Sequence, residues 1–184
     1  MQAAELNLKE ALQFDPQHGI LKLGQTRMIL SGTESMGALF QELINVGDVV
    51  AAQIVMRRFG EASGRQGART VKAEFQPADQ MEWFAFGPAL HVWEGVGLPR
   101  LVSFEYDGAE KFLLVIEFQS SYLAEQYLRV MGTASEPVCW ILAGYIAGYC
   151  SEVFGLNLLC RETTCVAKGD PICTFTCKPR EEWL

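Results

Sequence analysis

The sequence predicts an α+β fold in which antiparallel β-hairpins pack with helices and a cysteine-rich hairpin closes the C-terminal end. Two observations lead to this prediction. Turn signals divide the apolar segments into pairs of short strands, and helix-length apolar stripes separate one pair from the next. The resulting order of strands, helices, strands, helices and strands is typical of antiparallel α+β domains. With 184 residues, 49% of them apolar, the chain is long enough to bury the core of one domain.

The first expected elements are a short hairpin and a helix. Residues 19–31 (GILKLGQTRMILS) contain two short strands joined by Gly24 and Gln25, a pair that suits a tight turn. Thr33 is placed to cap the following helix, and Gly47 is placed to end it. The helix carries one apolar stripe, which predicts packing on the core through Met36, Leu39, Phe40, Leu43 and Ile44.

A second, longer helix is expected to begin at Asp48. Its large apolar residues predict the face that turns toward the core. These residues are Val50, Ile54, Val55 and Phe59. The helix also contains three glycines, each of which costs ~1 kcal/mol of helix stability against alanine. Gly60, Gly64 and Gly67 therefore indicate close packing against a neighbour, or a kink.

The next expected elements follow a segment at residues 75–95 that is rich in aromatic residues, Gly and Pro. Residues 98–106 and 111–118 read as two strands of a hairpin, because a turn signal that contains Gly108 separates them. Ser120 and Ser121 can cap a helix that stops at Gly132.

The last predicted elements are a buried helix and a closing hairpin. Pro137 occupies a position that is favoured as the first residue of a helix, and this helix ends near Gly155. Residues 138–159 are apolar but include Glu152, two tyrosines and three glycines, so they indicate a core helix followed by a strand rather than a membrane span. Residues 156–165 and 172–178 form the hairpin.

Charge and compartment restrict the function. The formal charge of −7 argues against nucleic-acid binding by this segment, because phosphate contacts need clustered Lys and Arg. The N-terminus lacks the basic start and apolar block of a secretory signal. We therefore expect the reducing cytoplasm, where cysteines serve as apolar filler, metal ligands or reactive groups and stable disulfides are rare.

Four of the six cysteines fall within residues 160–178, and their spacing is compatible with a metal site. Cys165 and Cys173 should face each other across the closing hairpin, which would supply half of a tetrahedral zinc site. Glu162 lies three residues before Cys165, and positions i and i+3 of a regular strand point to opposite faces. Both can bind one ion only if the strand bulges at Thr163 and Thr164.

A fourth ligand must come from elsewhere in the chain. Cys139 is the best candidate, because the first turn of the helix after Pro137 has free N–H groups that favour a thiolate. Cys177, four residues past Cys173, could take the place of Glu162. Four protein ligands would close the shell of the ion and make the site structural rather than catalytic. Spacing alone leaves zinc and a role without metal about equally open.

Three segments together resemble a known family: GPALHVWEG, EPVCWILAGYIAGY and RETTCVAKGDPICTF. They are similar to the N-terminal aromatic-effector sensor domain of XylR/DmpR/MopR-type sigma-54-dependent activators. The final part resembles the vinyl-4-reductase-type domain that these sensors include, and the likeness runs from about Gly24 to Trp183. The resemblance implies a structural Zn²⁺ held by Cys139, Glu162, Cys165 and Cys173.

The resemblance also implies an apolar pocket for a small aromatic effector. His91 matches a histidine of the family and is expected to be the polar anchor, since one polar group fixes the orientation of a ligand in an apolar pocket. Phe118 stands where phenol responders have a tryptophan, so we expect benzene, toluene or xylene to bind at least as well as phenol. The other expected wall residues are Phe84, Ile116, Tyr145, Tyr149, Leu159 and Cys160.

Partners and a division of the chain are implied as well. Residues 1–23 would pair two copies as a homodimer, residues 24–184 would form the sensing domain, and the vinyl-4-reductase-type part would occupy about 120–184. The dimer would cover Leu6, Leu8, Leu12, Phe14 and the following hairpin. A longer parent chain would add an AAA+ ATPase and a DNA-binding domain. No nucleotide loop and no serine–histidine–acid arrangement is visible in the sequence, so we expect no catalytic residues and no enzyme activity.

Two other functions stay open at this stage. A protein of the vinyl-4-reductase type could bind or reduce a tetrapyrrole or another hydrophobe. The fold expected from the resemblance is also similar to subunits of vesicle-tethering complexes, which would make the chain a zinc-stabilised protein-interaction module. A tethering module would leave the aromatic pocket without a role, so the sensor function is favoured.

Overall fold

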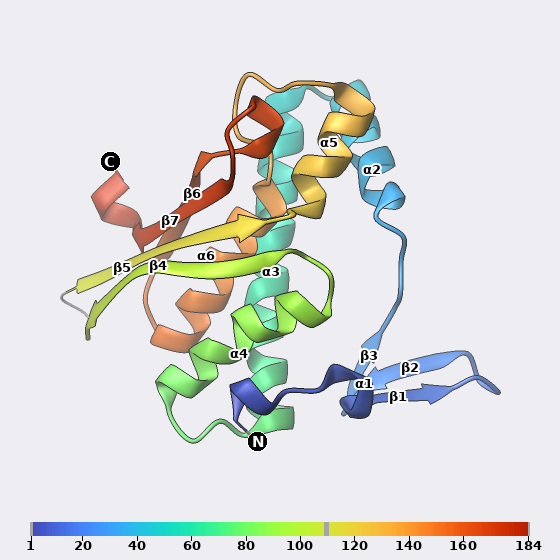
Figure 1. The fold of residues 1–184 in the computed structure, drawn as a ribbon, viewed down its shortest axis with the longest axis vertical. Coiled ribbons are helices and arrows are strands. Elements are labelled where there is room, and N and C mark those ends of the chain that lie inside the picture. The colour runs from blue at the N-terminus through green and yellow to red at the C-terminus, as the bar shows by residue number, and fades with distance from the viewer. Residues whose placement is uncertain (1, 109–110, 184) are drawn as a thin grey trace.

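The computed structural model describes residues 2–108 and 111–183. It has a main body of one sheet and several helices, and an N-terminal sheet that extends to one side (Figure 1). The strands are β1 (Leu12–Asp15), β2 (Ile20–Leu23), β3 (Thr26–Met28), β4 (Leu98–Asp107), β5 (Lys111–Gln119), β6 (Leu158–Thr164) and β7 (Cys173–Pro179). The α-helices are α1 (Leu8–Ala11), α2 (Glu34–Val46), α3 (Val49–Phe75), α4 (Gln80–Trp93), α5 (Tyr122–Met131) and α6 (Trp140–Phe154). The predicted α+β class is confirmed.

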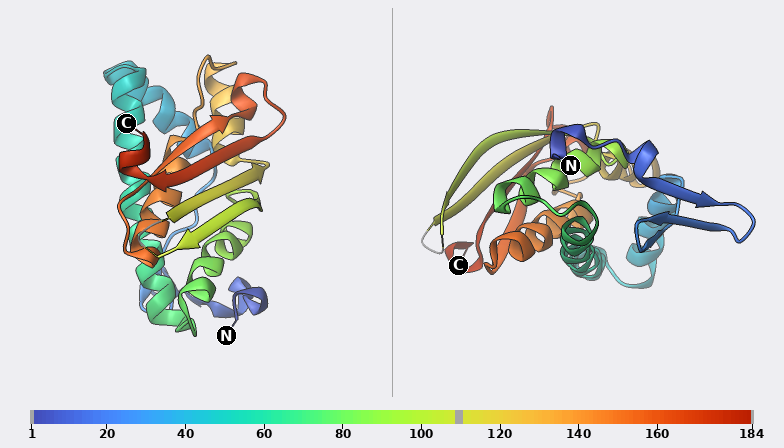
Figure 2. Two further views of the ribbon diagram at one scale, coloured as in Figure 1. Left: turned by 90° about the vertical axis from the view of Figure 1, so that its left-hand side faces the viewer. Right: turned by 90° about the horizontal axis from the view of Figure 1, so that it is seen from below.

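The main sheet joins both hairpins predicted for the second half of the chain. β4 pairs with β5 and β6 pairs with β7, and an antiparallel β5–β7 ladder links the two hairpins in the order β4-β5-β7-β6. The helices cover one face of this sheet (Figure 2). Helix α6 lies between the sheet and α3, which explains why nearly every residue of α6 is buried.

Helix α3 turns a different face to the core than the one predicted. Val50, Ile54, Val55 and Phe59 were expected to face inward, but each is about half exposed. The buried face consists of Ala52, Met56, Gly60, Gly64, Ala68, Val71 and Phe75, and four of these seven residues are Ala or Gly. The prediction was wrong because it assigned burial by side-chain size, whereas α3 meets α6 through residues that let the two backbones touch.

The glycines of these two helices make that approach possible. A Cβ atom on Gly64 would lie 2.8 Å from the backbone nitrogen of Tyr149 and would overlap the Tyr145 carbonyl. A Cβ on Gly148 of α6 would lie 2.8 Å from the carbonyl carbon of Glu61. Close packing, one of the two alternatives considered for the α3 glycines, is therefore confirmed.

Two further features differ from the sequence-based expectations. The aromatic segment at residues 75–95 had no assigned element because of its Gly and Pro residues, but it contains α4, with Pro88 inside the helix. Helix α6 begins at Trp140 rather than at Pro137. Cys139 is the residue before this helix, and its backbone N–H donates to Glu162 Oε2 at 2.8 Å, which ties the segment to the sheet.

The N-terminal segment is held within the chain to a greater extent than expected. Leu6 and Leu8 are buried, and β1 pairs with β2 in a three-stranded sheet of order β1-β2-β3. The expectation that Leu6 and Leu8 need a second copy to cover them is therefore wrong. Phe14 remains 64% exposed.

Candidate functional site

Four side chains from separate parts of the chain converge at one end of the main sheet. Cys139 precedes α6, Glu162 lies in β6, Cys165 follows β6 and Cys173 begins β7. One potential ligand atom from each lies within 4.8 Å of all the others. The Sγ atoms of Cys139 and Cys173 are 3.8 Å apart. The sequence-predicted metal ligands are thus brought together, and this cluster could hold a metal ion.

A local irregularity in β6 makes this convergence possible. In the β6–β7 ladder Glu162 pairs with Phe175, whereas Thr164 pairs with Thr174, so the register shifts between Glu162 and Thr164. The shift removes the regular alternation of faces that would otherwise separate Glu162 from Cys165. The bulge that the sequence required at this point is confirmed.

Hydrogen-bond partners from the backbone and from side chains surround the cluster. Asp170 accepts a hydrogen bond from the Cys165 backbone N–H through Oδ2 at 2.8 Å, and the Val166 N–H lies 3.4 Å from Cys173 Sγ. The Ser121 hydroxyl is 3.4 Å from Cys139 Sγ. Such contacts fix the positions of ligand side chains before a metal binds.

The environment of the cluster opposes the ionisation of some of its groups and favours that of Cys165. Burial raises the pKa of Cys139 and raises the pKa of Glu162, whereas hydrogen bonds from the Cys139 and Cys173 thiols lower the pKa of Cys165. Glu162 Oε1 is buried and has no hydrogen-bond partner among the described residues. A divalent cation would satisfy this oxygen and allow the thiols to ionise together.

A small cavity lies beside the cluster, between α4, α6 and β5. Its volume is about 20 Å³, and it is lined by Phe84, Gly87, Pro88, His91, Leu114, Ile116, Phe118, Tyr145, Ile146, Tyr149 and Cys150. Six of the eight predicted ligand-binding residues line it. The other two, Leu159 and Cys160, lie on β6 and are not among the lining residues. Phe118 pairs with Cys173 in the β5–β7 ladder, so cavity and cluster share neighbouring residues.

Aromatic rings and one histidine dominate the cavity wall. The rings of Tyr145 and Tyr149, four residues apart on α6, are stacked with centroids 6.0 Å apart. The Tyr149 hydroxyl donates to the Trp83 carbonyl at 2.7 Å. His91 is 5% exposed, and the centroid of its ring lies 4.7 Å from that of Tyr145 and 5.8 Å from that of Phe118. Its Nδ1 atom has no hydrogen-bond partner among the described residues.

Sequence reasoning missed five of the wall residues, which are Gly87, Pro88, Leu114, Ile146 and Cys150. A Cβ on Gly87 would lie 2.9 Å from the Tyr149 ring, so the glycine makes room for that ring. The sequence did carry a signal, because Gly87 lies four residues before His91 on the same helix. Cys150 could not be separated from ordinary apolar core in the same way.

The remaining cysteines form part of the core rather than the cluster. Cys177 pairs directly with Cys160 in the β6–β7 ladder, and both are fully buried. Burial, followed by the neighbouring Cys150 and Cys160, raises the pKa of the Cys177 thiol. All six cysteines are free thiols.

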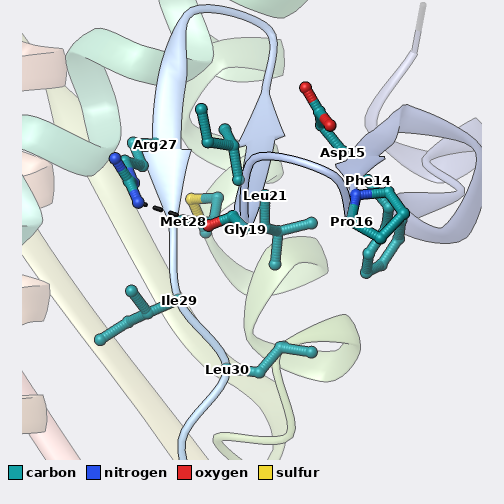
Figure 3. A pocket seen from close by; sticks show the side chains of 10 residues that line it. Phe14, Asp15, Pro16, Gly19, Leu21, Arg27, Met28, Ile29 and Leu30 are labelled. Carbon is teal, nitrogen blue, oxygen red and sulfur yellow. Dashed lines mark hydrogen bonds between the residues drawn. The ribbon is translucent and has the colours of Figure 1, made fainter.

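A wider cleft lies on the N-terminal sheet, far from the cysteine cluster (Figures 1 and 3). It has a volume of about 380 Å³ and is bordered by Phe14, Ile29 and Leu30, all largely exposed. Within it, the Arg27 guanidinium donates to the Gly19 carbonyl at 3.4 Å (Figure 3). An open apolar surface of this kind is typical of protein contacts rather than of small-molecule sites.

Among the described helices, none has the length and apolar composition needed to cross a bilayer.

The fold and the site together form an α+β body with an aromatic cavity next to a candidate metal centre. The chain belongs to the family described as activators of aromatic catabolism, whose XylR_N model matches residues 7–107. A model of the vinyl-4-reductase-type domain matches residues 121–179. Both family assignments implied by the sequence motifs are confirmed.

Individual relatives agree with this assignment. The chain is 30% identical over 96% of its length to the phenol regulator MopR of Acinetobacter guillouiae, and 28% identical over 96% to the transcriptional regulatory protein XylR of Pseudomonas putida. It covers 32% and 31% of these relatives, about a third of their length. The phenol-responsive sensory domain of the activator PoxR, solved with phenol, aligns over 96% of this chain and 89% of its own, with 32% identity and a TM-score of 0.88. These relatives are regulators rather than enzymes.

Proposed function

We propose that this chain is the effector-sensing domain of a bacterial transcriptional activator and binds a one-ring aromatic molecule in the cavity beside His91. The observation that carries this proposal is the buried imidazole of His91 in a wall that is otherwise mainly aromatic and aliphatic. A small aromatic ligand with one polar group would bond to a ring nitrogen of this histidine, which would fix the orientation of the ligand.

The ion that best fits the cysteine cluster is Zn²⁺ in a structural role. Three thiolates and one carboxylate are typical zinc ligands, and tetrahedral bonds of ~2.3 Å place two sulfur ligands about 3.8 Å apart. The observed distance between Cys139 Sγ and Cys173 Sγ is 3.8 Å. When bound, the ion would fix the start of α6 against β6 and β7, and four protein ligands would leave no open position for a substrate.

The small size of the cavity suggests how binding becomes a signal. A volume of about 20 Å³ holds about one water molecule, whereas a benzene ring needs on the order of 150 Å³. An aromatic effector must therefore displace side chains of α4, α6 and β5. Because Phe118 is the strand neighbour of Cys173, that displacement is transmitted to the element that holds the metal.

The Phe118→Trp variant is expected to shift effector preference toward phenols. Phe118 offers no hydrogen-bond donor, so the unaltered domain should bind phenol no more than a few-fold more tightly than toluene. An indole N–H near the ligand hydroxyl would favour phenol by about three- to tenfold in the phenol-to-toluene affinity ratio, the value of one neutral hydrogen bond. Calorimetric titration with benzene, toluene and phenol measures the ratio within each variant, so any general loss from overpacking cancels.

The matched control is Phe118→Leu, which also lacks a donor and should leave the ratio unchanged. If the unaltered domain binds phenol at least tenfold more tightly than toluene, the role assigned to Phe118 is wrong and a wall tyrosine must supply the donor. If no aromatic ligand binds at all, the sensor function is wrong.

The longer chains of the relatives support a wider context. We propose that the parent protein of this domain carries an AAA+ ATPase and a DNA-binding domain and acts in the cytoplasm, and that residues 24–184 are the sensing part. In this arrangement effector binding would be relayed from the sensor to the ATPase.

We also propose a homodimer formed through the N-terminal sheet. Phe14, Ile29 and Leu30 leave apolar surface in and around the cleft of Figure 3. Phe59 of α3 is also exposed and borders a second cleft together with Leu23 and Met28 of the N-terminal sheet. Light scattering at micromolar concentration should give about twice 20.5 kDa. An Ile29→Glu variant should lower the mass toward the monomer, because a charge would be buried in the interface. Leu101→Glu, which makes the same replacement of an exposed apolar residue by a charged one but on β4, is the control and should leave the mass unchanged. A monomer from the unaltered chain would contradict the proposal.

A further inference from the structure

We propose that Glu94 is a positioning residue that fixes the tautomer of His91 and so determines how strongly the cavity favours hydroxylated over plain aromatic effectors. This inference rests on the proposed effector function. It concerns a residue that does not line the cavity and that the sequence motifs left without a role.

Glu94 is the nearest partner for the unpaired atom of His91. The Glu94 backbone N–H caps the C-terminal end of α4 by donating to the Leu90 carbonyl at 2.8 Å. Its Oε2 atom lies 3.6 Å from His91 Nδ1, slightly beyond hydrogen-bond distance. A small side-chain rotation closes this gap, and no other partner for Nδ1 is present among the described residues.

The carboxylate of Glu94 stands between two environments. Its side chain is 31% exposed and borders, with Tyr145 and Leu90, a separate cleft of about 470 Å³. Tyr145 lines both this cleft and the His91 cavity, so its ring is the wall between them. Burial, and next the charge of Glu94, raises the pKa of Tyr145, which places the carboxylate within electrostatic reach of the cavity wall.

The hydrogen bond of one imidazole nitrogen decides the chemistry of the other. When Nδ1–H donates to Glu94, the neutral ring must present a lone pair at Nε2. That nitrogen then accepts a hydrogen bond from a phenolic O–H but offers no polar contact to benzene or toluene. Without Glu94 the proton can move to Nε2, and the ring loses its preference for a ligand that donates.

The test combines two substitutions of Glu94 in a chain with a single histidine. His18→Gln removes the exposed second histidine, so nitrogen NMR then reports on His91 alone. Glu94→Met keeps the side-chain length but removes the acceptor, and Glu94→Gln keeps an oxygen that can accept from Nδ1–H. Calorimetry with phenol and with toluene measures the affinity ratio for each variant.

The unaltered chain should show the Nδ1–H tautomer. Glu94→Met should shift the ring toward the Nε2–H tautomer and lower the phenol-to-toluene affinity ratio about fivefold, with toluene affinity unchanged. Glu94→Gln should keep most of the Nδ1–H tautomer and most of the affinity ratio of the unaltered chain. Identical nitrogen shifts and an unchanged ratio in Glu94→Met would overturn the inference, as would equal losses for both ligands. If neither ligand binds the unaltered chain, the effector function fails, while the NMR result still decides whether Glu94 holds His91.

Discussion

The Cys165→Ser variant is expected to lose its metal ion and to unfold around the C-terminal hairpin. Cys165 contributes one of four ligand atoms that lie within 4.8 Å of one another, and a serine hydroxyl is a poor zinc ligand. Binding of a structural zinc contributes directly to folding, so its loss should cost more than about 5 kcal/mol, a value comparable to the whole stability of an ordinary domain. Elemental analysis and thermal unfolding measure the two effects.

The hairpin supplies a matched control for this change. Cys177 is as fully buried as Cys165 and lies on β7, but it faces Cys160 rather than the cluster. Cys177→Ser should keep about one zinc per chain and lose only about 1–3 kcal/mol, the cost of burying a hydroxyl without a partner. A Cys165→Ser protein with full zinc content and an unchanged unfolding temperature would refute the metal centre.

The cysteine cluster also shows how far sequence reasoning reached. The spacing of Glu162, Cys165 and Cys173 set a physical condition, a bulge in the strand, and the register shift between Glu162 and Thr164 meets it. Such a condition can be derived locally, because strand alternation and hairpin pairing act over a few residues. The contribution of Cys139 depends on packing between distant elements, so the residues alone could name it only as the best candidate for the fourth ligand, and the motif resemblance implied the same residue.

Helix α3 is the clearest case in which the sequence led to a wrong face. Phe59 and Ile54 are the apolar residues that periodicity assigns to a core, yet they lie on the exposed side. The helix instead turns its glycines toward α6, because contact between two backbones contributes more packing than contact through long side chains at that place. Nothing in the chain's local pattern distinguishes a glycine that permits close contact from one that weakens a helix.

The aromatic cavity was predictable in its residues but not in its size. His91, Phe118, Tyr145 and Tyr149 could be grouped by motif, and the structure brings them to one wall. The volume of about 20 Å³ depends on how closely α6 approaches α3 and α4, which follows from the small residues at those contacts. The shape of the cavity and the packing of the helices are therefore coupled through the same two tyrosines.

This coupling leads to a second large expected effect, in the Gly64→Ala variant. In a solvent-exposed helix the change would stabilise by about 1 kcal/mol, because alanine is the better helix former. At this position the new Cβ would overlap the Tyr145 carbonyl and lie 2.8 Å from the Tyr149 nitrogen, both of which are backbone atoms of α6. The two helices must then move apart, which should lower the free energy of unfolding by about 3 kcal/mol.

Chemical denaturation of Gly64→Ala and of Gln66→Ala separates packing from helix propensity. Gln66 lies two residues away on the exposed side of α3, so its replacement should change the free energy of unfolding by less than about 0.5 kcal/mol. An increase in stability for Gly64→Ala would mean that α3 and α6 are not in backbone contact.

Gly64→Ala should also bind toluene more weakly, since a displaced α6 would move Tyr145 and Tyr149 away from their positions opposite His91 and Phe118. A purely local cost of the extra methyl group would leave toluene affinity unchanged, so the two measurements together show whether the helix contact sets the shape of the cavity.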